Sequence, residues 1–338
     1  MSAPRPKLCL LLGDPSGVGP EMAIKLLARP ETLQQADILL IADPQALASG
    51  ERIAGHKVNG LAVHKLEDVY FKPGQATVLL QDTLHGQAPV LGTSNLASGR
   101  ASYQALELAV EAVKQDCVDA LLFAPLNKHS LRLGGLQQED ELRFMQERFG
   151  INHFVCEFNI TGSLWTSRVT SHVPVREVAD LITQDGVCDA VRIIDRALRL
   201  AGVAKPRIAV SGLNPHAGDG GSIGMEEIEV IAPAVQKLQA EGLDARGPFS
   251  PDTVFIGARR GDVDAVVSMY HDQGQIAMKL MGFESGVTLH GGLPVPVATS
   301  ASGSAFDIAG KGMAGIEGLN EAFKLCVNMA RSRLAVSA

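Results

Sequence analysis

The chain has 338 residues, of which 46% are hydrophobic and 20% are charged, a composition typical of globular proteins that fold around a buried core. Its net charge of −7 and the absence of a basic stripe argue against nucleic-acid binding, and no apolar run reaches the length of about 18 residues that a membrane helix needs. The length predicts two domains, or one large α/β unit with a second lobe.

The amino-terminal segment has a short apolar stretch that continues directly into Gly-Asp-Pro, so we expect no signal peptide. Strands then alternate with helices along the chain, which predicts βαβ units and a largely parallel sheet. In chain order, the expected elements are strand 7–12, helix 20–28, strand 37–41, helix 102–116, strand 120–124, strands 168–170 and 207–210, helix 225–241 and strand 265–268.

The cysteines are scattered and show no Cys-x-x-Cys spacing, which is typical of reduced thiols and predicts a cytoplasmic protein. They are Cys9, Cys117, Cys156, Cys188 and Cys326.

Three histidines each follow a predicted strand and precede a turn: His172 in "VTSHVP", His216 in "GLNPHAGDGG" and His271 in "MYHDQG". Structural zinc sites use closely paired ligands, whereas these residues are far apart in sequence and suit a site assembled from several strand ends. Three neutral imidazoles with an open position would hold a divalent cation that polarises a substrate hydroxyl or carbonyl. The alternative is three unrelated loop histidines.

Glycine-rich turns occur at strand ends in "GDPSGVGPE", "GLNPHAGDGG" and "GSAFDIAGKG". Glycine permits tight turns and close approach of the backbone to a ligand, although surface loops with helix-capping glycines have the same composition. The first turn lacks both the dinucleotide fingerprint and the P-loop lysine. The candidate cofactor contacts in these turns are Gly13, Asp14, Asn214, Gly218, Ser304 and Asp307.

Candidate catalytic side chains lie close to these turns. Asp252 in "SPDTVF" and Asp272 beside His271 could orient an imidazole or act as a general base, and solvated turn aspartates are the alternative. Lys128 in "APLNKHSL" follows a strand end and is either a catalytic cation or a solvated lysine.

Six motifs occur along the chain in this order: "GDPSGVGPE", "APLNK", "TSHVPVREVADLIT", "GLNPHAGDGGSIGMEEI", "SPDTVF" and "MYHDQG…K…GF". Together they resemble the 4-hydroxythreonine-4-phosphate dehydrogenase family of pyridoxal phosphate biosynthesis. The resemblance extends from about Lys7 to about Asn328. The loop "GSAFDIAGKG" is also similar to the cofactor loop of isopropylmalate and isocitrate dehydrogenases.

The resemblance implies two α/β lobes with the active site in the cleft between them. We expect residues 1–130 and 290–338 to form the cofactor lobe, and residues 131–289 to form the lobe with the metal site and the dimer interface. It further implies a homodimer in which His172 and His216 of one subunit bind a divalent metal together with His271 from the partner. Zinc, magnesium, manganese and cobalt all stay open, although imidazole ligands favour the softer ions.

The family reaction implied by the resemblance is NAD-dependent oxidation of a secondary alcohol of a hydroxy acid, followed by decarboxylation. The substrate contacts implied by the motifs are Glu139, Asp140, Lys279 and Thr288. Three of these depart from the family, because Glu139 and Asp140 replace His and Thr and Thr288 replaces Asn. In addition, Ala298 replaces an Arg, and the cofactor loop has lost its His in "ASGSA".

These departures point away from a phosphorylated substrate, since two carboxylates would repel a phosphate dianion. One alternative is an unphosphorylated substrate such as an aromatic cis-dihydrodiol carboxylate of the terephthalate dihydrodiol type. Another is a non-catalytic binding protein on the same fold.

Overall fold

The computed structural model describes residues 5–282 and 285–337. The chain divides into two compact units, each of which is described by itself below. Unit 1 comprises Met1–Asn152 and Leu293–Ala338, and unit 2 comprises His153–Gly292. The domain boundary that we expected near residue 130 falls inside the helix Lys128–Gly134 of unit 1. The core of unit 1 continues beyond this point, since it includes Phe144 and Met145.

Unit 1 contains a parallel sheet with the strand order β3-β4-β2-β1-β5-β12. Residues Leu8–Leu11 of β1 are all buried, as expected for a strand that is covered on both faces. The strands are β1 (Lys7–Leu11), β2 (Asp37–Ala42), β3 (Gly60–Val63), β4 (Ala76–Leu80), β5 (Ala120–Phe123) and β12 (Val297–Ser300).

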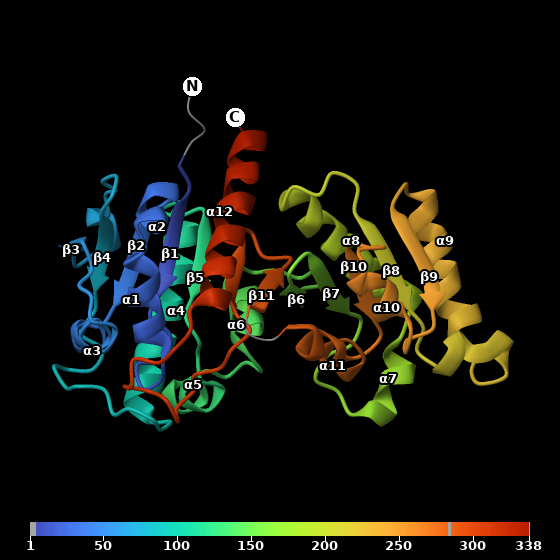
Figure 1. The fold of residues 1–338 in the computed structure, drawn as a ribbon, viewed down its shortest axis with the longest axis horizontal. Helices are drawn as coiled ribbons and strands as arrows, with labels where there is room; N and C mark the ends of the chain where they lie inside the picture. Colours follow the sequence, from blue (N-terminus) through green and yellow to red (C-terminus); the bar gives the residue numbers. More distant parts are fainter. Residues whose placement is uncertain (1–4, 283–284, 338) are drawn as a thin grey trace. The chain divides into compact units, whose positions relative to one another are not determined.

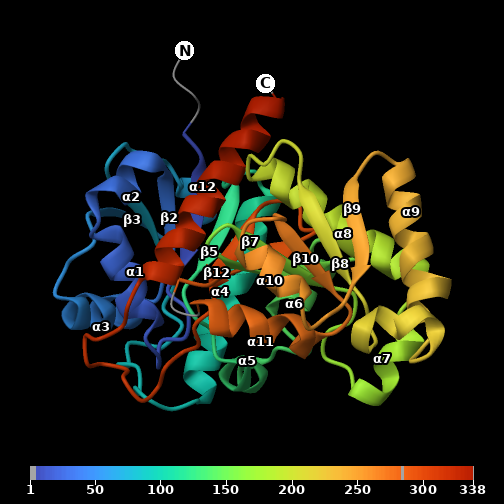
Figure 2. The ribbon, with the colours of Figure 1, turned by 45° about the vertical axis from the view of Figure 1, so that its right-hand side comes forward.

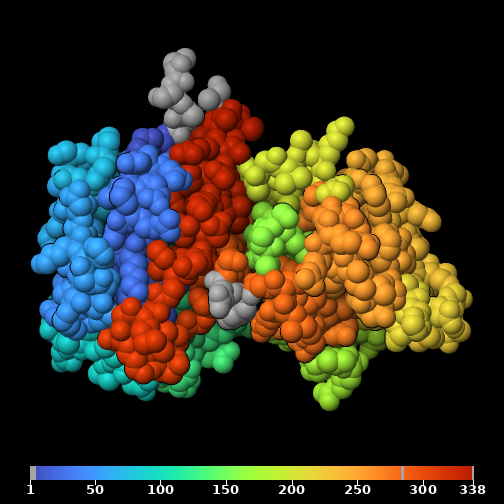
Figure 3. All heavy atoms as spheres, viewed as in Figure 1, coloured from blue at the N-terminus to red at the C-terminus, as the bar shows by residue number. Residues whose placement is uncertain are grey.

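Helices pack against this sheet, and α12 lies beside α1 on the face of unit 1 seen in Figures 1 and 3. Asp43, Asn95, Asn127 and Asp140 cap four of these helices with their side chains, which satisfies backbone N–H groups that lack a helical partner. The helices are α1 (Gly19–Leu27), α2 (Pro30–Gln35), α3 (Pro44–Ala54), α4 (Leu96–Lys114), α5 (Lys128–Gly134), α6 (Glu141–Arg148), α12 (Glu317–Ser337) and the 3₁₀ turn η1 (Leu66–Asp68).

Glycines allow α4 and α5 to pack closely. A Cβ atom on Gly99 would overlap the backbone of Ser130, and one on Gly134 would overlap the backbone of Gly99. We therefore expect Gly99→Ala to lower the free energy of unfolding by about 1–3 kcal/mol, the usual cost of overpacking. Urea unfolding would measure this. Gly303→Ala is the control because a Cβ there meets open space, and equal stability of both variants would contradict the prediction.

Unit 2 has the strand order β11-β6-β7-β10-β8-β9, in which β6 runs antiparallel to both of its neighbours and the remaining pairs are parallel. The strands are β6 (Cys156–Thr161), β7 (Leu164–Arg168), β8 (Arg207–Ser211), β9 (Asp244–Phe249), β10 (Ala265–Ser268) and β11 (Val287–Gly291).

The helices of unit 2 include α8, which buries an apolar stripe, and α9, which lies beside β9 in Figure 2. The bounds are α7 (Val175–Leu181), α8 (Gln184–Leu200), α9 (Ala232–Ala240), α10 (Val254–Arg259), α11 (His271–Gly282), the 3₁₀ segment η2 (Pro215–Gly221) and the π-helical turn η3 (Glu227–Ile231).

The expected α/β fold is confirmed, although several elements differ from the expected ones. The strand expected at 168–170 is wrong, because β7 spans Leu164–Arg168 and the chain bends at Val169. The cause is a strand rich in hydroxyl side chains, "LWTSR", whose burial the apolar pattern did not indicate. The helix expected at 225–241 begins with the π-helical turn η3 before continuing as α9. The "GF" of the last family motif ends at Phe283, which lies outside the described residues.

Across residues 5–282 and 285–337, none of the helices combines the length and the apolar character that a bilayer span requires.

Candidate active site

Unit 2 places the three candidate metal ligands at one edge of its sheet. The parallel strands β7, β10 and β8 are neighbours in this order, so their carboxyl ends meet at the same edge. The segments that follow them carry His172, His271 and His216, respectively. The sequence prediction that these turns belong to one site therefore has a topological basis within unit 2.

Two of the imidazoles lie close together in the same chain. The ring centroids of His172 and His271 are 5.7 Å apart, with an angle of 43° between the ring planes. His172 is exposed and His271 is half-buried, so solvent ions can reach both rings. Neutral imidazoles are common ligands of divalent cations, so the proximity of the two rings is compatible with the predicted use of both as ligands.

His216 lies in an unusual left-handed turn. Five consecutive residues, from His216 to Gly220, have φ between 44° and 80°. Histidine is among the side chains that tolerate this region better than most, and Gly218 has no alternative, because a Cβ there would lie 2.7 Å from a carboxylate oxygen of Glu227. The turn thus presents an exposed imidazole on a backbone that needs external support.

The buried carboxylate of Glu227 supplies this support. It is 2% exposed, and its Oε1 accepts hydrogen bonds from the backbone N–H groups of Leu213 and Asn214, both at 2.7 Å. The side-chain amide of Asn214 donates to Glu227 at 2.9 Å and to Glu226 at 2.7 Å. Asn214, which we expected to contact the cofactor, therefore uses its amide to hold the His216 turn. Glu227 was missed in the sequence because its partners lie 13 and 14 residues away.

The stretch "MYHDQG" uses the side chains of His271, Asp272 and Gln273 in contacts at the strand ends. The Nδ1 of His271 lies 2.7 Å from Asp272 Oδ1, and a contact of this kind fixes the ring and leaves the other ring nitrogen for a ligand. Gln273 accepts a hydrogen bond from the Met269 N–H at 2.6 Å and donates to the Gly212 carbonyl at 2.8 Å. Gln273 thus ties the end of β10 to the end of β8.

In unit 1, the first glycine turn follows β1. Gly13 has a φ of +77°, and a Cβ there would lie 2.5 Å from the carbonyl oxygen of Pro125, so only glycine fits. Asp14 is fully buried and accepts a hydrogen bond from the Ser16 N–H at 2.8 Å. Burial raises the pKa of the Asp14 carboxyl, and hydrogen bonds with Ser16, Ser130 and Ser98 act in the opposite direction. Gly13 and Asp14 thus form a hydrogen-bonded turn at the carboxyl end of the parallel strand β1.

The second cofactor segment of unit 1 is fastened to α1. The Ser304 carbonyl accepts a hydrogen bond from the Val18 N–H at 3.0 Å. Further along, the buried Glu21 accepts from the Ala314 N–H at 2.8 Å and from Lys25 at 2.7 Å. Ser304 is buried and Asp307 is exposed. The candidates Gly13, Asp14, Ser304 and Asp307 thus share one unit, whereas Asn214 and Gly218 belong to the His216 turn of unit 2.

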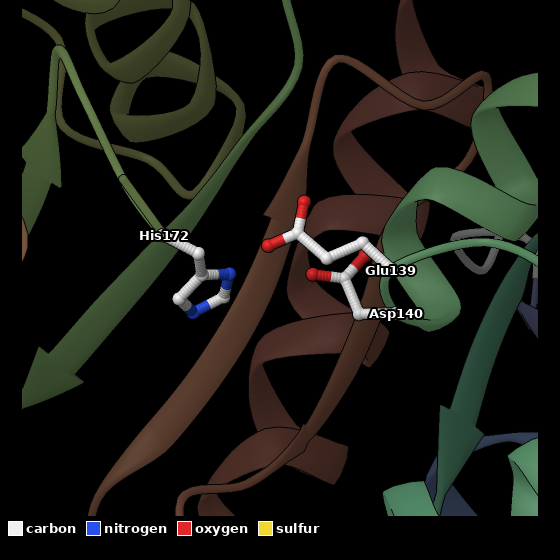
Figure 4. Close-up of side chains that lie close together, drawn as sticks. All are labelled: Glu139, Asp140 and His172. Carbon is white, nitrogen blue, oxygen red and sulfur yellow. The ribbon is translucent and has the colours of Figure 1, made fainter. Parts of the chain in front are cut away.

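The two acidic residues predicted to contact the substrate, Glu139 and Asp140, differ in their surroundings. Asp140, 4% exposed, is the N-cap of α6 and accepts a hydrogen bond from the Arg143 N–H at 2.9 Å. Glu139 is exposed at the start of the same helix. Figure 4 draws these two side chains of unit 1, together with His172 on the segment that follows β7 in unit 2. Lys128 is the exposed first residue of α5.

The remaining candidates are distributed over unit 2. Thr288 on β11 accepts a hydrogen bond from the Asn159 amide at 3.4 Å. Lys279 is exposed in the last turn of α11. Asp252 is exposed in the turn after β9 and accepts a hydrogen bond from the Ser250 hydroxyl at 2.7 Å.

A family model described as the pyridoxal phosphate biosynthetic protein PdxA matches residues 34–326 of the chain. The chain belongs to this family. A Pseudomonas aeruginosa relative of the PdxA family, 4-hydroxythreonine-4-phosphate dehydrogenase 2 by its provisional name, is 48% identical over 339 residues, which cover 98% of this chain and 100% of the relative.

Two solved structures extend the comparison. A 4-hydroxythreonine-4-phosphate dehydrogenase from Burkholderia phymatum is 33% identical, with a TM-score of 0.79, over 96% of this chain and 98% of its own. A terephthalate 1,2-cis-dihydrodiol dehydrogenase from Burkholderia xenovorans is 28% identical, with a TM-score of 0.68, over 96% and 98% of the two chains.

Membership of the PdxA family confirms the resemblance that the motifs indicated. The chain is a dehydrogenase, an oxidoreductase that acts on a CH–OH group, and dehydrogenases of this family use a nicotinamide dinucleotide and a divalent metal and decarboxylate their product. The alternative of a non-catalytic binding protein gains no support from these relatives, which are named as dehydrogenases.

Proposed function

We propose that this dehydrogenase oxidises a secondary alcohol of an unphosphorylated hydroxy acid, with NAD as hydride acceptor and with loss of carbon dioxide from the product. The observation that carries the proposal is the set of three supported histidine turns at one edge of the unit 2 sheet. His172, His216 and His271 would hold the divalent cation. When bound, the cation would polarise the hydroxyl oxygen of the substrate and make its proton easier to remove.

The residues of the chain divide the remaining work. Asp272 orients the His271 ring, and the turn of Gly13 and Asp14 together with Ser304 and Asp307 would receive NAD in unit 1. Oxidation moves a hydride from the carbinol carbon to the nicotinamide and leaves the hydroxyl proton for a base. Asp252 and Lys128 are our candidates for this proton transfer, since both are exposed and follow strand ends.

The substrate class follows from the exposed carboxylate of Glu139, which by resemblance stands where relatives contact a phosphate. Two like charges at about 4 Å repel by about 4 kcal/mol at an effective dielectric constant of about 20. The exposed Lys279 could offset only about 0–1 kcal/mol of this. We therefore propose a substrate whose far end is uncharged or carries an amine.

Steady-state kinetics, followed through NADH formation, tests this substrate class. The assays contain added zinc, cobalt, magnesium or manganese, and are repeated with NADP in place of NAD. We expect kcat/KM for 4-hydroxythreonine 4-phosphate to be at least about 10-fold below that for its unphosphorylated analogue, a conservative, heavily screened fraction of the repulsion above. Glu139→Gln should narrow this difference. Glu147→Gln on α6 is the matched control, and efficient turnover of the phosphate ester by the unmodified chain would refute the substrate class.

A second candidate substrate is an aromatic cis-dihydrodiol carboxylate. It is favoured by the likeness to the terephthalate dihydrodiol dehydrogenase over nearly the whole chain. Such a substrate has a hydroxyl and a carboxylate but no phosphate, so it meets the same requirement at the Glu139 end. Including one in the substrate panel separates the two candidates.

A homodimer is part of the proposal. Helix α11, which begins with His271, exposes Ile276 by 61% and Leu280 by 83%. These residues are four positions apart and so lie on one face of the helix. Figure 3 shows α11 at the surface of unit 2. Exposed large apolar side chains grouped on a helix are typical of protein–protein contacts, and a second copy of the chain is the partner we propose.

A cytoplasmic location is also proposed. The structure forms no disulfide among its cysteines: Cys9, Cys117, Cys156, Cys188 and Cys326 are all free thiols, which suits a reducing compartment.

A further inference from the structure

An arginine that the sequence analysis did not select lies beneath the His172 turn. Arg168, the last residue of β7, is only 4% exposed. Its guanidinium donates to Glu157 at 2.8 Å and to Asn159 at 2.9 Å, both on the antiparallel neighbour β6. Because desolvation of a charged side chain is costly, the position of a buried arginine is set by its hydrogen-bond partners.

The third hydrogen bond of this guanidinium reaches the His172 turn. Arg168 Nε donates to the hydroxyl of Ser171 at 2.8 Å, and Ser171 immediately precedes His172. Thr170 in the same turn donates its hydroxyl to the Met269 carbonyl at 2.8 Å. The backbone leading to His172 is therefore fixed at two adjacent residues by side-chain contacts.

Asn159 extends the same network to the helix that carries His271. Its Oδ1 accepts both the Arg168 bond and a hydrogen bond from Gln275 Nε2 on α11. Its Nδ2 donates to Thr288 on β11. One amide side chain thus connects β6, the end of β7, α11 and β11.

We propose that Arg168 and Asn159 are positioning residues that fix the segments carrying His172 and His271 and so orient each imidazole for cation binding. Arg168 cannot bind substrate itself, because it is buried and each of its three nitrogens already has a partner. The inference rests on the metal site of the proposed function. It also explains why the polar strand "LWTSR" is buried.

The test is binding of cobalt(II) to the full-length chain after removal of metals with a chelator. Calorimetry gives the affinity, and the visible absorption band of the bound cobalt reports the ligand geometry. We expect Arg168→Met and Asn159→Ala to weaken cobalt binding by about 10- to 100-fold, as loss of outer partners does at metal sites, and to change the band. Ser171→Ala removes only the hydrogen bond from Arg168. It should leave the fold intact and give a smaller loss of cobalt affinity, so it tests the proposal even if Arg168→Met does not fold.

Arg207→Met is the matched control. Arg207 makes a bidentate ion pair with Asp264 in the same unit, but at the amino end of β8. Its loss should reduce stability without changing cobalt affinity. Unchanged affinity and spectrum in folded Arg168→Met, Asn159→Ala and Ser171→Ala proteins would overturn the positioning role alone. A wild-type chain that binds no cobalt would overturn the metal site, and the positioning role with it.

Discussion

Replacing His216 by asparagine should weaken binding of the divalent cation by more than about 100-fold, the upper end of what loss of an outer partner costs, and should reduce turnover in parallel. Asparagine is the appropriate substitution because it tolerates the left-handed backbone of residue 216, where φ is 54°. It therefore removes the imidazole without adding strain to the turn that Glu227 supports. Metal content and calorimetric affinity measure the effect, and the thermal unfolding of the metal-free protein reports whether the fold persists.

The control for this variant is His56→Ala, which removes an exposed histidine of unit 1. It should leave metal content and turnover unchanged. A His216→Asn protein that retains a full complement of metal would show that this imidazole is not a ligand.

Mixing inactive His172→Ala and His271→Ala proteins should restore activity if the partner subunit supplies His271. In a heterodimer, one site then carries both substitutions and the other carries none. With equal mixing, half of the dimers are mixed, so we expect about a quarter of wild-type activity. Subunit exchange can be verified by native mass spectrometry.

The alternative is that one chain supplies both imidazoles, whose ring centroids are 5.7 Å apart within the chain. If one chain supplied both imidazoles, neither site of a mixed dimer would be intact and no activity would return. Mixing His172→Ala with His216→Ala is the control, because both residues come from the same subunit in the shared site and no recovery is expected.

The sequence predicted the strands that form continuous apolar runs, such as β1, β5 and β10. It did not predict β6 and β7, where buried polar residues of β7 bond to β6 across the antiparallel pair. Pattern analysis detects apolar periodicity but not polar groups that satisfy one another.

The candidate site shows the same division. The three histidines were predicted from their positions after strands, which requires only local information. The role of Asp140 as the N-cap of α6 and the use of the Asn214 amide by Glu227 depend on the three-dimensional turn geometry. Glu227 was missed because its partners in the His216 turn lie 13 and 14 residues away. Arg168 was missed because its partners Glu157 and Asn159 are brought near by the pairing of β6 with β7.

The antiparallel pairing of β6 with β7 has a consequence for how unit 2 folds. The turn between these strands is short, with Ile160 paired to Trp165, so closing this hairpin costs little chain entropy. The pairing of β7 with β10 joins Trp165 to Ala265 and closes a far longer loop. The support of the His172 turn by Glu157 and Asn159 is therefore encoded within a sequence-local hairpin, whereas the approach of His271 depends on long-range closure, the slower kind of contact to form.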